Sequence, residues 1–321
     1  MLTDAIFRTV TVLVSALAAA GCAVIYFKNI RMERPAVGVF NGRDVAVLLT
    51  FILILPLFYL ILPAWGLTVM LTLTFTGALY IVLRPMLRPR YIWPLIFLLL
   101  GGNIWIALHY LESDLGWQVY WVFTSVVMML TSAGVANLYV QGGMRLRHVA
   151  WFSFVLAGYD AFFIFVIPLS AQLADLFVGR PLDPSMGFRM GPYNANIGLG
   201  DLLVFCCYAI AAYKGFGRRG LISAFTIIII FGALIPSISP LIISAVVRQG
   251  IGIAVPAQAS FGPAALITYF LLSRRAKERS MKEWMALEAA QGLATTPGSR
   301  IVRRIATPAL ADVQGSVQGS D

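Results

Sequence analysis

The segments Gly158-Tyr159-Asp160 and Gly198-Leu199-Gly200-Asp201 decide how this chain is interpreted, because each places an aspartate inside an apolar stretch. Of the 14 acidic residues, these two aspartates are the only ones that we place well inside a predicted membrane span. A carboxylate in hydrocarbon costs roughly 2.5 kcal/mol or more. A chain that carries two of them on neighbouring helices is expected to use both.

The composition is that of a polytopic membrane protein. Of the 321 residues, 60% are hydrophobic and only 12% are charged, whereas soluble domains contain roughly 25% charged residues. The net charge of +10 comes from basic residues in short loops beside apolar stretches and in the C-terminal tail. That distribution is a signal of membrane topology. We therefore expect a lipid bilayer as a partner, and no nucleic acid.

Nine apolar stretches are each long enough to cross about 30 Å of hydrocarbon as a helix. The predicted fold is therefore an all-α membrane domain over residues 1–272. A cytoplasmic tail over residues 273–321 is expected to be basic at first and then disordered. Its basic part is expected to form a helix to about Gln291. The third predicted span follows a short turn at residues 63–66 and ends at about residue 83. The other eight spans cover about residues 10–27, 45–62, 92–108, 117–139, 149–170, 197–213, 221–247 and 251–272.

The basic residues predict an orientation. Of the 24 Lys and Arg, 20 lie in the tail and in the loops after spans 1, 3, 5 and 7, and only four lie on the other side. Because basic loops stay in the cytoplasm, we expect the N-terminus outside and the C-terminus inside. Modest loops and the lack of an organelle signal favour a prokaryotic cell membrane.

The chemistry of two facing carboxylates predicts acid–base catalysis. Spans 6 and 7 are antiparallel neighbours, so Asp160 and Asp201 can approach each other. Two carboxyls that share a proton titrate apart, and one is ionised while the other is neutral. Such a pair can hydrolyse an amide with a water molecule and needs no metal or cofactor. His109 and His148 flank different spans on opposite sides, so they form no ligand set.

The positions of the aspartates along their spans set a geometric requirement. Counted along straight helices, Asp160 lies about 15 Å from the outer end of span 6, whereas Asp201 lies about 6 Å into span 7. The two carboxyls meet only if span 7 begins below the membrane surface, or if span 6 ends early or tilts. We expect a sunken start at a wet entrance. Gly198 and Gly200 are expected to let a neighbouring backbone come close.

Together the motifs resemble the presenilin and signal peptide peptidase family of intramembrane aspartyl proteases. That family carries Tyr-Asp in its sixth span, Gly-x-Gly-Asp in its seventh and Pro-Ala-Leu at the start of its ninth. This chain has Tyr159-Asp160 and Gly198-Leu199-Gly200-Asp201 in spans of the same number, and Pro256-Ala257-Gln258 for the third motif. There Gln replaces the Leu of the family, and a second Pro-Ala at Pro263-Ala264 competes. The predicted orientation resembles the signal peptide peptidase branch.

The resemblance implies roles for these residues. Asp160 and Asp201 would be the catalytic pair, and Pro256 would keep the head of span 9 partly unwound beside them. Tyr159 would either bond a carboxylate or pack. The substrate would be a transmembrane helix that is opened locally. The Gly- and Pro-rich loop at residues 171–196 is a candidate for a strand that pairs with it.

Two other interpretations remain open. A proton-coupled transporter or channel would also use buried carboxylates, with further polar groups along its path. Asn103, Asn137 and Gln258 are candidates for such groups. A transporter is also expected to show repeated halves, which this sequence lacks. A membrane scaffold without catalysis is hard to reconcile with two intramembrane acids.

Overall fold

The structure is a computed structural model of the chain. It describes residues 2–32, 42–165, 176–177, 179–190, 193–239, 257–290, 293–295 and 301–304. Pro256, the first residue of the predicted third motif, lies outside this part.

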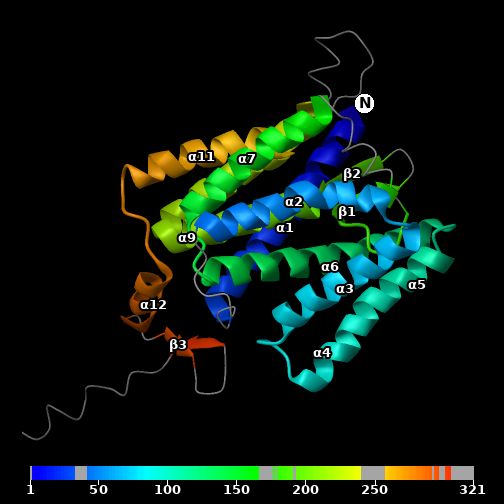
Figure 1. Ribbon diagram of the computed structural model, residues 1–321, viewed down its shortest axis with the longest axis horizontal. Coiled ribbons are helices and arrows are strands. Elements are labelled where there is room, and N and C mark those ends of the chain that lie inside the picture. Colours follow the sequence, from blue (N-terminus) through cyan, green and yellow to red (C-terminus); the bar gives the residue numbers. More distant parts are fainter. Residues whose placement is uncertain are drawn as a thin grey trace, which may run out of the picture.

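The chain is mostly helical, and its helices follow the predicted apolar stretches (Figure 1). Two π-helical segments, η1 and η2, interrupt or extend them. The elements are α1 (Leu2–Asn29), α2 (Gly42–Ile61), α3 (Ala64–Leu83), α4 (Pro89–Ile96), η1 (Phe97–Gly101), α5 (Gly102–His109), α6 (Asp114–Gln141), α7 (Leu146–Phe165), α9 (Leu199–Ile227), η2 (Ile228–Leu234), α11 (Ala257–Ser273) and α12 (Met281–Ala290).

Within the described residues, five helical segments are long and apolar enough to cross a membrane. The chain is therefore a helical membrane protein. Helices α2, α7 and α11 lie on three other predicted spans but are not among these five, so the count of nine spans stays a prediction. The five segments are Ala5–Asn29, Trp65–Leu83, Pro89–His109, Asp114–Gln141 and Leu199–Ser239.

The last segment has 41 residues and is divided into two helices at Gly217. The φ of Gly217 is 66° and its ψ is −145°, a conformation that glycine adopts readily and other residues rarely do. The break falls in the basic turn predicted between residues 213 and 221. Predicted spans 7 and 8 therefore begin in the two halves of this segment.

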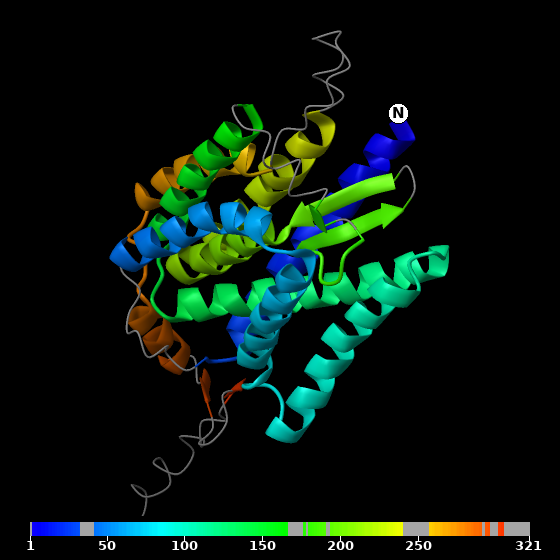
Figure 2. The same ribbon diagram turned by 45° about the vertical axis from the view of Figure 1, so that its right-hand side comes forward.

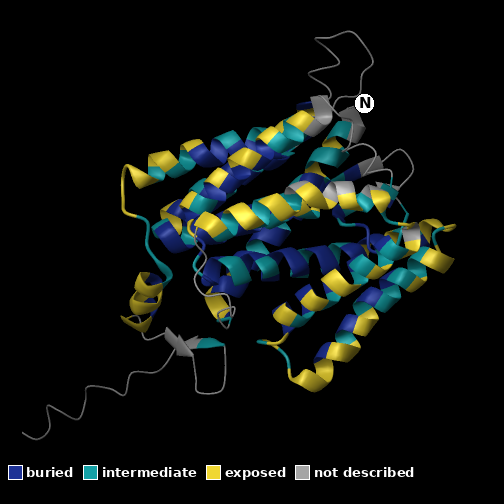
Figure 3. Cartoon of the chain, in the orientation of Figure 1, coloured by how far each residue is buried: buried dark blue, intermediate teal, exposed yellow. Residues whose placement is uncertain are grey.

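Helices α1, α6 and α9 pack together in the centre of the molecule. Buried residues gather on α6 and α9, whereas α2 is largely exposed (Figure 3). The exposed side chains include large apolar ones, such as Phe51, Ile61 and Phe97. A surface that faces lipid is expected to be apolar, so these exposed side chains are suited to contact with lipid rather than with water.

The predicted loop at residues 171–196 contains a β-hairpin. Strand β1 (Ser185–Met190) pairs antiparallel with β2 (Tyr193–Gly198), and β2 leads directly into α9 (Figure 2). The sequence predicts that span 7 begins at about Ile197, and α9 begins two residues later, at Leu199, because the β ladder continues to Gly198. Gly187 has a φ of 144°, and a Cβ there would lie 2.2 Å from the Ala195 carbonyl oxygen. Only glycine fits this place in the hairpin.

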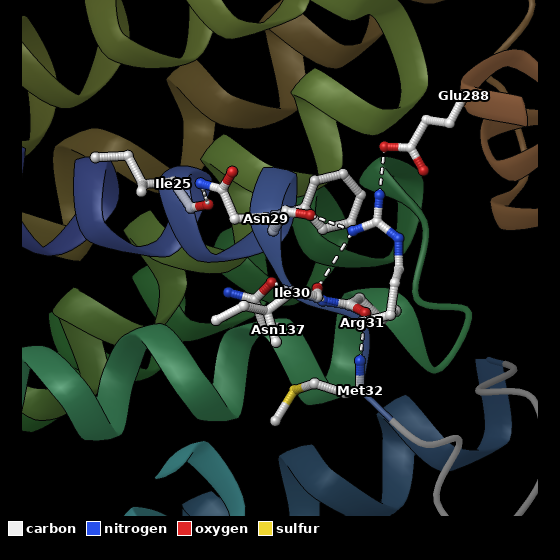
Figure 4. Close-up of polar contacts among 9 residues, drawn as sticks. Ile25, Asn29, Ile30, Arg31, Met32, Asn137 and Glu288 are labelled. Carbon is white, nitrogen blue, oxygen red and sulfur yellow. Dashed lines mark hydrogen bonds and ion pairs between the residues drawn. The ribbon is translucent and has the colours of Figure 1, made fainter. Parts of the chain in front are cut away.

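The tail is docked against the membrane domain. Helix α12 agrees with the predicted helix, and the Trp284 ring on it lies 4.9 Å from that of Tyr213. Figure 4 shows Arg31, just beyond α1, paired with Glu288 of α12. The expected disorder is wrong for two short strands, β3 (Leu293–Thr295) and β4 (Val302–Arg304), which pair antiparallel.

We predict that Glu288→Ala loosens α12, because it leaves Arg31 half-buried without its carboxylate. A hydrogen bond to a charged group contributes about 1.5–3 kcal/mol. Limited trypsin digestion of the protein in lipid vesicles should therefore cut the tail faster. Charge reversal at both positions, Arg31→Glu with Glu288→Arg, should restore resistance. Unchanged digestion of Glu288→Ala would show that the pair does not hold the helix.

Candidate functional site

Helix α7, which carries Asp160, packs closely along α11. A Cβ built at Gly262 of α11 would lie 2.4 Å from the Ser153 carbonyl oxygen and 2.7 Å from the Ala157 Cβ, so the two backbones touch there. Further along, the rings of Trp151 and Phe270 lie 6.5 Å apart. As residue numbers rise on α11 they fall on α7, so the two helices are antiparallel, as Figures 1 and 2 also show.

Helix α9, which carries Asp201, packs on another side of α11. The Phe205 and Phe261 rings lie 4.7 Å apart, and the Tyr208 hydroxyl donates a 2.9 Å hydrogen bond to the Ala265 carbonyl oxygen. Residue numbers rise together in these contacts, so α9 and α11 run parallel at this point. Helix α11 is therefore the element that relates α7 to α9.

These contacts bring the three predicted motifs to one level. A helical turn is about 3.6 residues. One turn before Gly262 on α11 lies Gln258, and one turn beyond Ala157 on α7 lies Asp160. One turn before Phe205 on α9 lies Asp201. The start of α11 and the two aspartates therefore share one layer of the molecule.

The two aspartates lie close to each other. Helices α7 and α9 are in contact, and the carboxyl of Asp160 is near enough to that of Asp201 to interact electrostatically. Both side chains are half-buried. Asp201 lies in the first turn of α9, directly after β2. Tyr159 is half-buried and also interacts electrostatically with Asp160.

Gly198 and Gly200 lie differently from the expectation. A Cβ added at either glycine would meet no atom of the described neighbours within 4 Å, and both residues are exposed. The prediction that they admit a neighbouring backbone is therefore wrong for the part of the chain that the structure describes. They leave open space just before Asp201. Ala257, by contrast, is half-buried at the first position of α11.

Two of the polar residues proposed for a transport path, Asn103 and Asn137, form hydrogen bonds that connect elements of the fold. Asn103 donates to the Thr124 hydroxyl at 2.7 Å and accepts from the Leu182 amide at 2.9 Å. Asn137 donates to the Ala23 carbonyl oxygen at 3.0 Å and so links α6 to α1. Sequence alone identified both as polar but could not show that their hydrogen bonds are used up within the fold.

Gln258 differs from these two residues. Its side chain is buried, with 2% of the residue exposed. Neither its amide nitrogen nor its amide oxygen has a hydrogen-bond partner within the described chain. The sequence marks this residue as a departure from the family motif and as a candidate polar group of a transport path, and neither role predicts a buried amide without a partner.

Lys214 is one of the basic residues in the loop after predicted span 7, which the sequence uses only to predict topology. It is completely buried, and its ammonium group donates to the carbonyl oxygens of Val140 and Met144. These carbonyls lie at and just after the C-terminal end of α6, where a helix has unpaired carbonyl groups and favours positive charge. Its position 13 residues after Asp201 carries no sequence signal for this role.

No group of three or more His, Cys, Asp or Glu within the described residues is placed to hold a metal ion. No model of a known protein family matches the chain, and no curated protein matches it either. The resemblance to intramembrane aspartyl proteases therefore rests on the sequence motifs alone.

We predict that Gly262→Ala destabilises the protein, because the new methyl group would push α11 away from the backbone of Ser153. Overpacking of this kind costs about 1–3 kcal/mol. Gly77→Ala is the matched control, since a Cβ at Gly77 of α3 meets no described atom within 4 Å. Thermal unfolding in detergent should show a lower midpoint for Gly262→Ala alone. Equal midpoints for the two variants would contradict the close contact of α7 and α11.

Proposed function

We propose that this chain is an intramembrane aspartyl endopeptidase that hydrolyses peptide bonds within transmembrane helices or signal peptides. The observation that carries the proposal is the proximity of Asp160 and Asp201 on two helices in contact, α7 and α9, at the level where α11 begins. Intramembrane acidic residues are costly, and are expected to serve a function. The motifs that surround them, Tyr159-Asp160 and Gly198-Leu199-Gly200-Asp201, are similar to those of the presenilin and signal peptide peptidase family.

The proposed reaction needs only the two carboxyls and water. The ionised carboxylate takes a proton from water as the water oxygen attacks the peptide carbonyl carbon, and the neutral carboxyl gives its proton to the carbonyl oxygen. In the resulting diol the roles reverse. The first aspartate, now protonated, gives its proton to the leaving nitrogen, and the second takes one from the diol as the C–N bond breaks. Both aspartates return to their starting states, and no covalent enzyme intermediate forms.

The space before Asp201 supports access by a peptide. Gly198 and Gly200 are exposed, and no side chain of theirs narrows the approach to the carboxyls. Because the carbonyls of a helix are already hydrogen-bonded, a substrate helix has to be opened locally before water can attack. The paired strands β1 and β2 lie next to this space, and a strand edge is a common partner for an extended peptide.

We place the protein in a prokaryotic cell membrane with its N-terminus outside and its C-terminus in the cytoplasm. The orientation is supported by the asymmetry of 20 basic residues against four, and the prokaryotic membrane by the modest loops. This orientation is similar to that of the signal peptide peptidase branch, and favours substrate helices whose N-terminus is cytoplasmic. The membrane-facing apolar helices make lipid a permanent partner.

We predict that the purified protein in lipid vesicles cleaves a reconstituted single-span helical substrate. Asp160→Asn and Asp201→Asn should each lower the rate by about 10²–10⁴-fold, the usual contribution of a general acid or base. Mass spectrometry of the products measures the cleavage. Glu112 is an exposed acidic residue in the turn after α5, so Glu112→Gln is the control and should cleave normally.

Wild-type rates in either aspartate variant would reject the pair. A second assay on the same vesicles distinguishes the rival function. Proton-driven ion or solute flux that needs both aspartates, without any cleavage, would establish a transporter instead. The hydrogen-bonded state of Asn103 and Asn137 removes two of the three groups that such a path had been expected to use.

A further inference from the structure

Gln258 is a buried polar side chain whose hydrogen bonds are left unsatisfied by the described part of the fold. A carboxamide offers two N–H donors and an oxygen that accepts twice, and none of these is used within the described chain. Buried polar groups in proteins are nearly always hydrogen-bonded, and an exception calls for a missing partner. The residue lies at the second position of α11, where the carboxamide has no hydrogen-bond partner among the residues that the structure describes.

The position of Gln258 supplies the second observation. The contacts of Gly262 with α7 and of Phe261 with α9 place Gln258 one turn away, level with both Asp160 and Asp201. The unsatisfied amide therefore lies in the layer that contains the two carboxyls. A group that completes its hydrogen bonds would lie beside the reacting bond.

The chemistry of a carboxamide identifies that group. In an extended peptide, the N–H and the C=O of one residue point to the same side, as they do in a β ladder. A Gln side chain can accept from that N–H and donate to that C=O at once. A helical residue cannot be bound in this way, because its N–H and C=O point along the axis in opposite directions and are already paired.

We propose that Gln258 is a substrate-positioning residue that binds the main-chain N–H and C=O of one extended substrate residue next to the cleaved bond. The proposal rests on the proposed protease function. Recognition through the main chain selects a locally unwound helix and is indifferent to the side chain at that position. It assigns a role to the residue at which this chain departs from the Pro-Ala-Leu motif.

The first test is stability without substrate. Gln258→Leu removes an unsatisfied buried amide, so it should raise the thermal midpoint by about 2–4 °C. Gln141→Leu is the matched control. Gln141 is also buried, but it donates to the Ile30 carbonyl oxygen and to Asn137 and accepts from the Met32 amide. Its loss should lower the midpoint. A lower midpoint for Gln258→Leu would overturn the proposal by showing a structural partner.

The second test is cleavage of backbone-modified substrates. Gln258→Leu should lower kcat/KM about tenfold, the effect of losing a hydrogen bond or two. Esters are then placed one at a time in the residues flanking the cleaved bond, each removing one main-chain N–H. At one position the ester should slow the wild type about tenfold and leave Gln258→Leu unaffected. Full activity of Gln258→Leu, or equal ester effects in both proteins at every position, would overturn the proposal.

The two tests separate this inference from the proposed function. If the wild type cleaves no helical substrate, the protease proposal fails, and the role of Gln258 in substrate binding fails with it, whatever the thermal result. If the wild type cleaves through both aspartates and the ester series shows no coupling, only the role of Gln258 is lost. If Gln258 instead holds the catalytic water, Gln258→Leu should have a lower kcat, and each ester should slow the wild type and the variant equally. That result would also remove the role of Gln258 in substrate binding.

Discussion

The contact of α11 with α7 at Gly262 is the constraint on which the site depends. There the absence of a side chain lets two helix backbones touch, and close approach of small residues is a main source of helix association in lipid, where the hydrophobic effect gives no net drive. The same helix meets α9 through Phe261 and Tyr208. One element thus fixes the relative height of Asp160 and Asp201, which are 41 residues apart in the chain.

The interior of the molecule shows how polar groups are kept in a membrane protein. Asn137 of α6 donates a hydrogen bond to α1, Tyr26 donates to the Val82 carbonyl oxygen, and Lys214 donates to carbonyl oxygens at the end of α6. Each of these groups is satisfied by the fold, as the low polarity of the surroundings requires. Gln258 is also buried, but the described residues offer it no such partner, and this contrast distinguishes it from the structural polar residues.

Much of the helical architecture could be predicted from the sequence, because apolar length alone determines where a helix can lie in lipid. The ends of α2, α3 and α6 follow the predicted spans to within a few residues. The neighbourhood of the two aspartates was also predictable, since consecutive spans joined by a loop pack as antiparallel neighbours.

Other features were not readable from the sequence. The hairpin of β1 and β2 depends on the positive φ of Gly187. Because the loop contains several glycines, the sequence does not show which of them adopts this conformation. The short strands of the tail, β3 and β4, have only three residues each, which is too short for a recognisable strand pattern in the sequence. The roles of Lys214 and Gln258 depend on burial, which no local pattern gives. The open space at Gly198 and Gly200 likewise needed the three-dimensional arrangement.

The central claim is that Asp160 and Asp201 act together on one peptide bond. An experimental structure with a bound peptide whose cleavable bond is replaced by a hydroxyl-bearing isostere tests this most directly. The account predicts that the isostere hydroxyl lies within hydrogen-bonding distance, about 2.6–3.2 Å, of both carboxyls. A hydroxyl that contacts only one carboxyl, or a peptide bound away from α7 and α9, would contradict it.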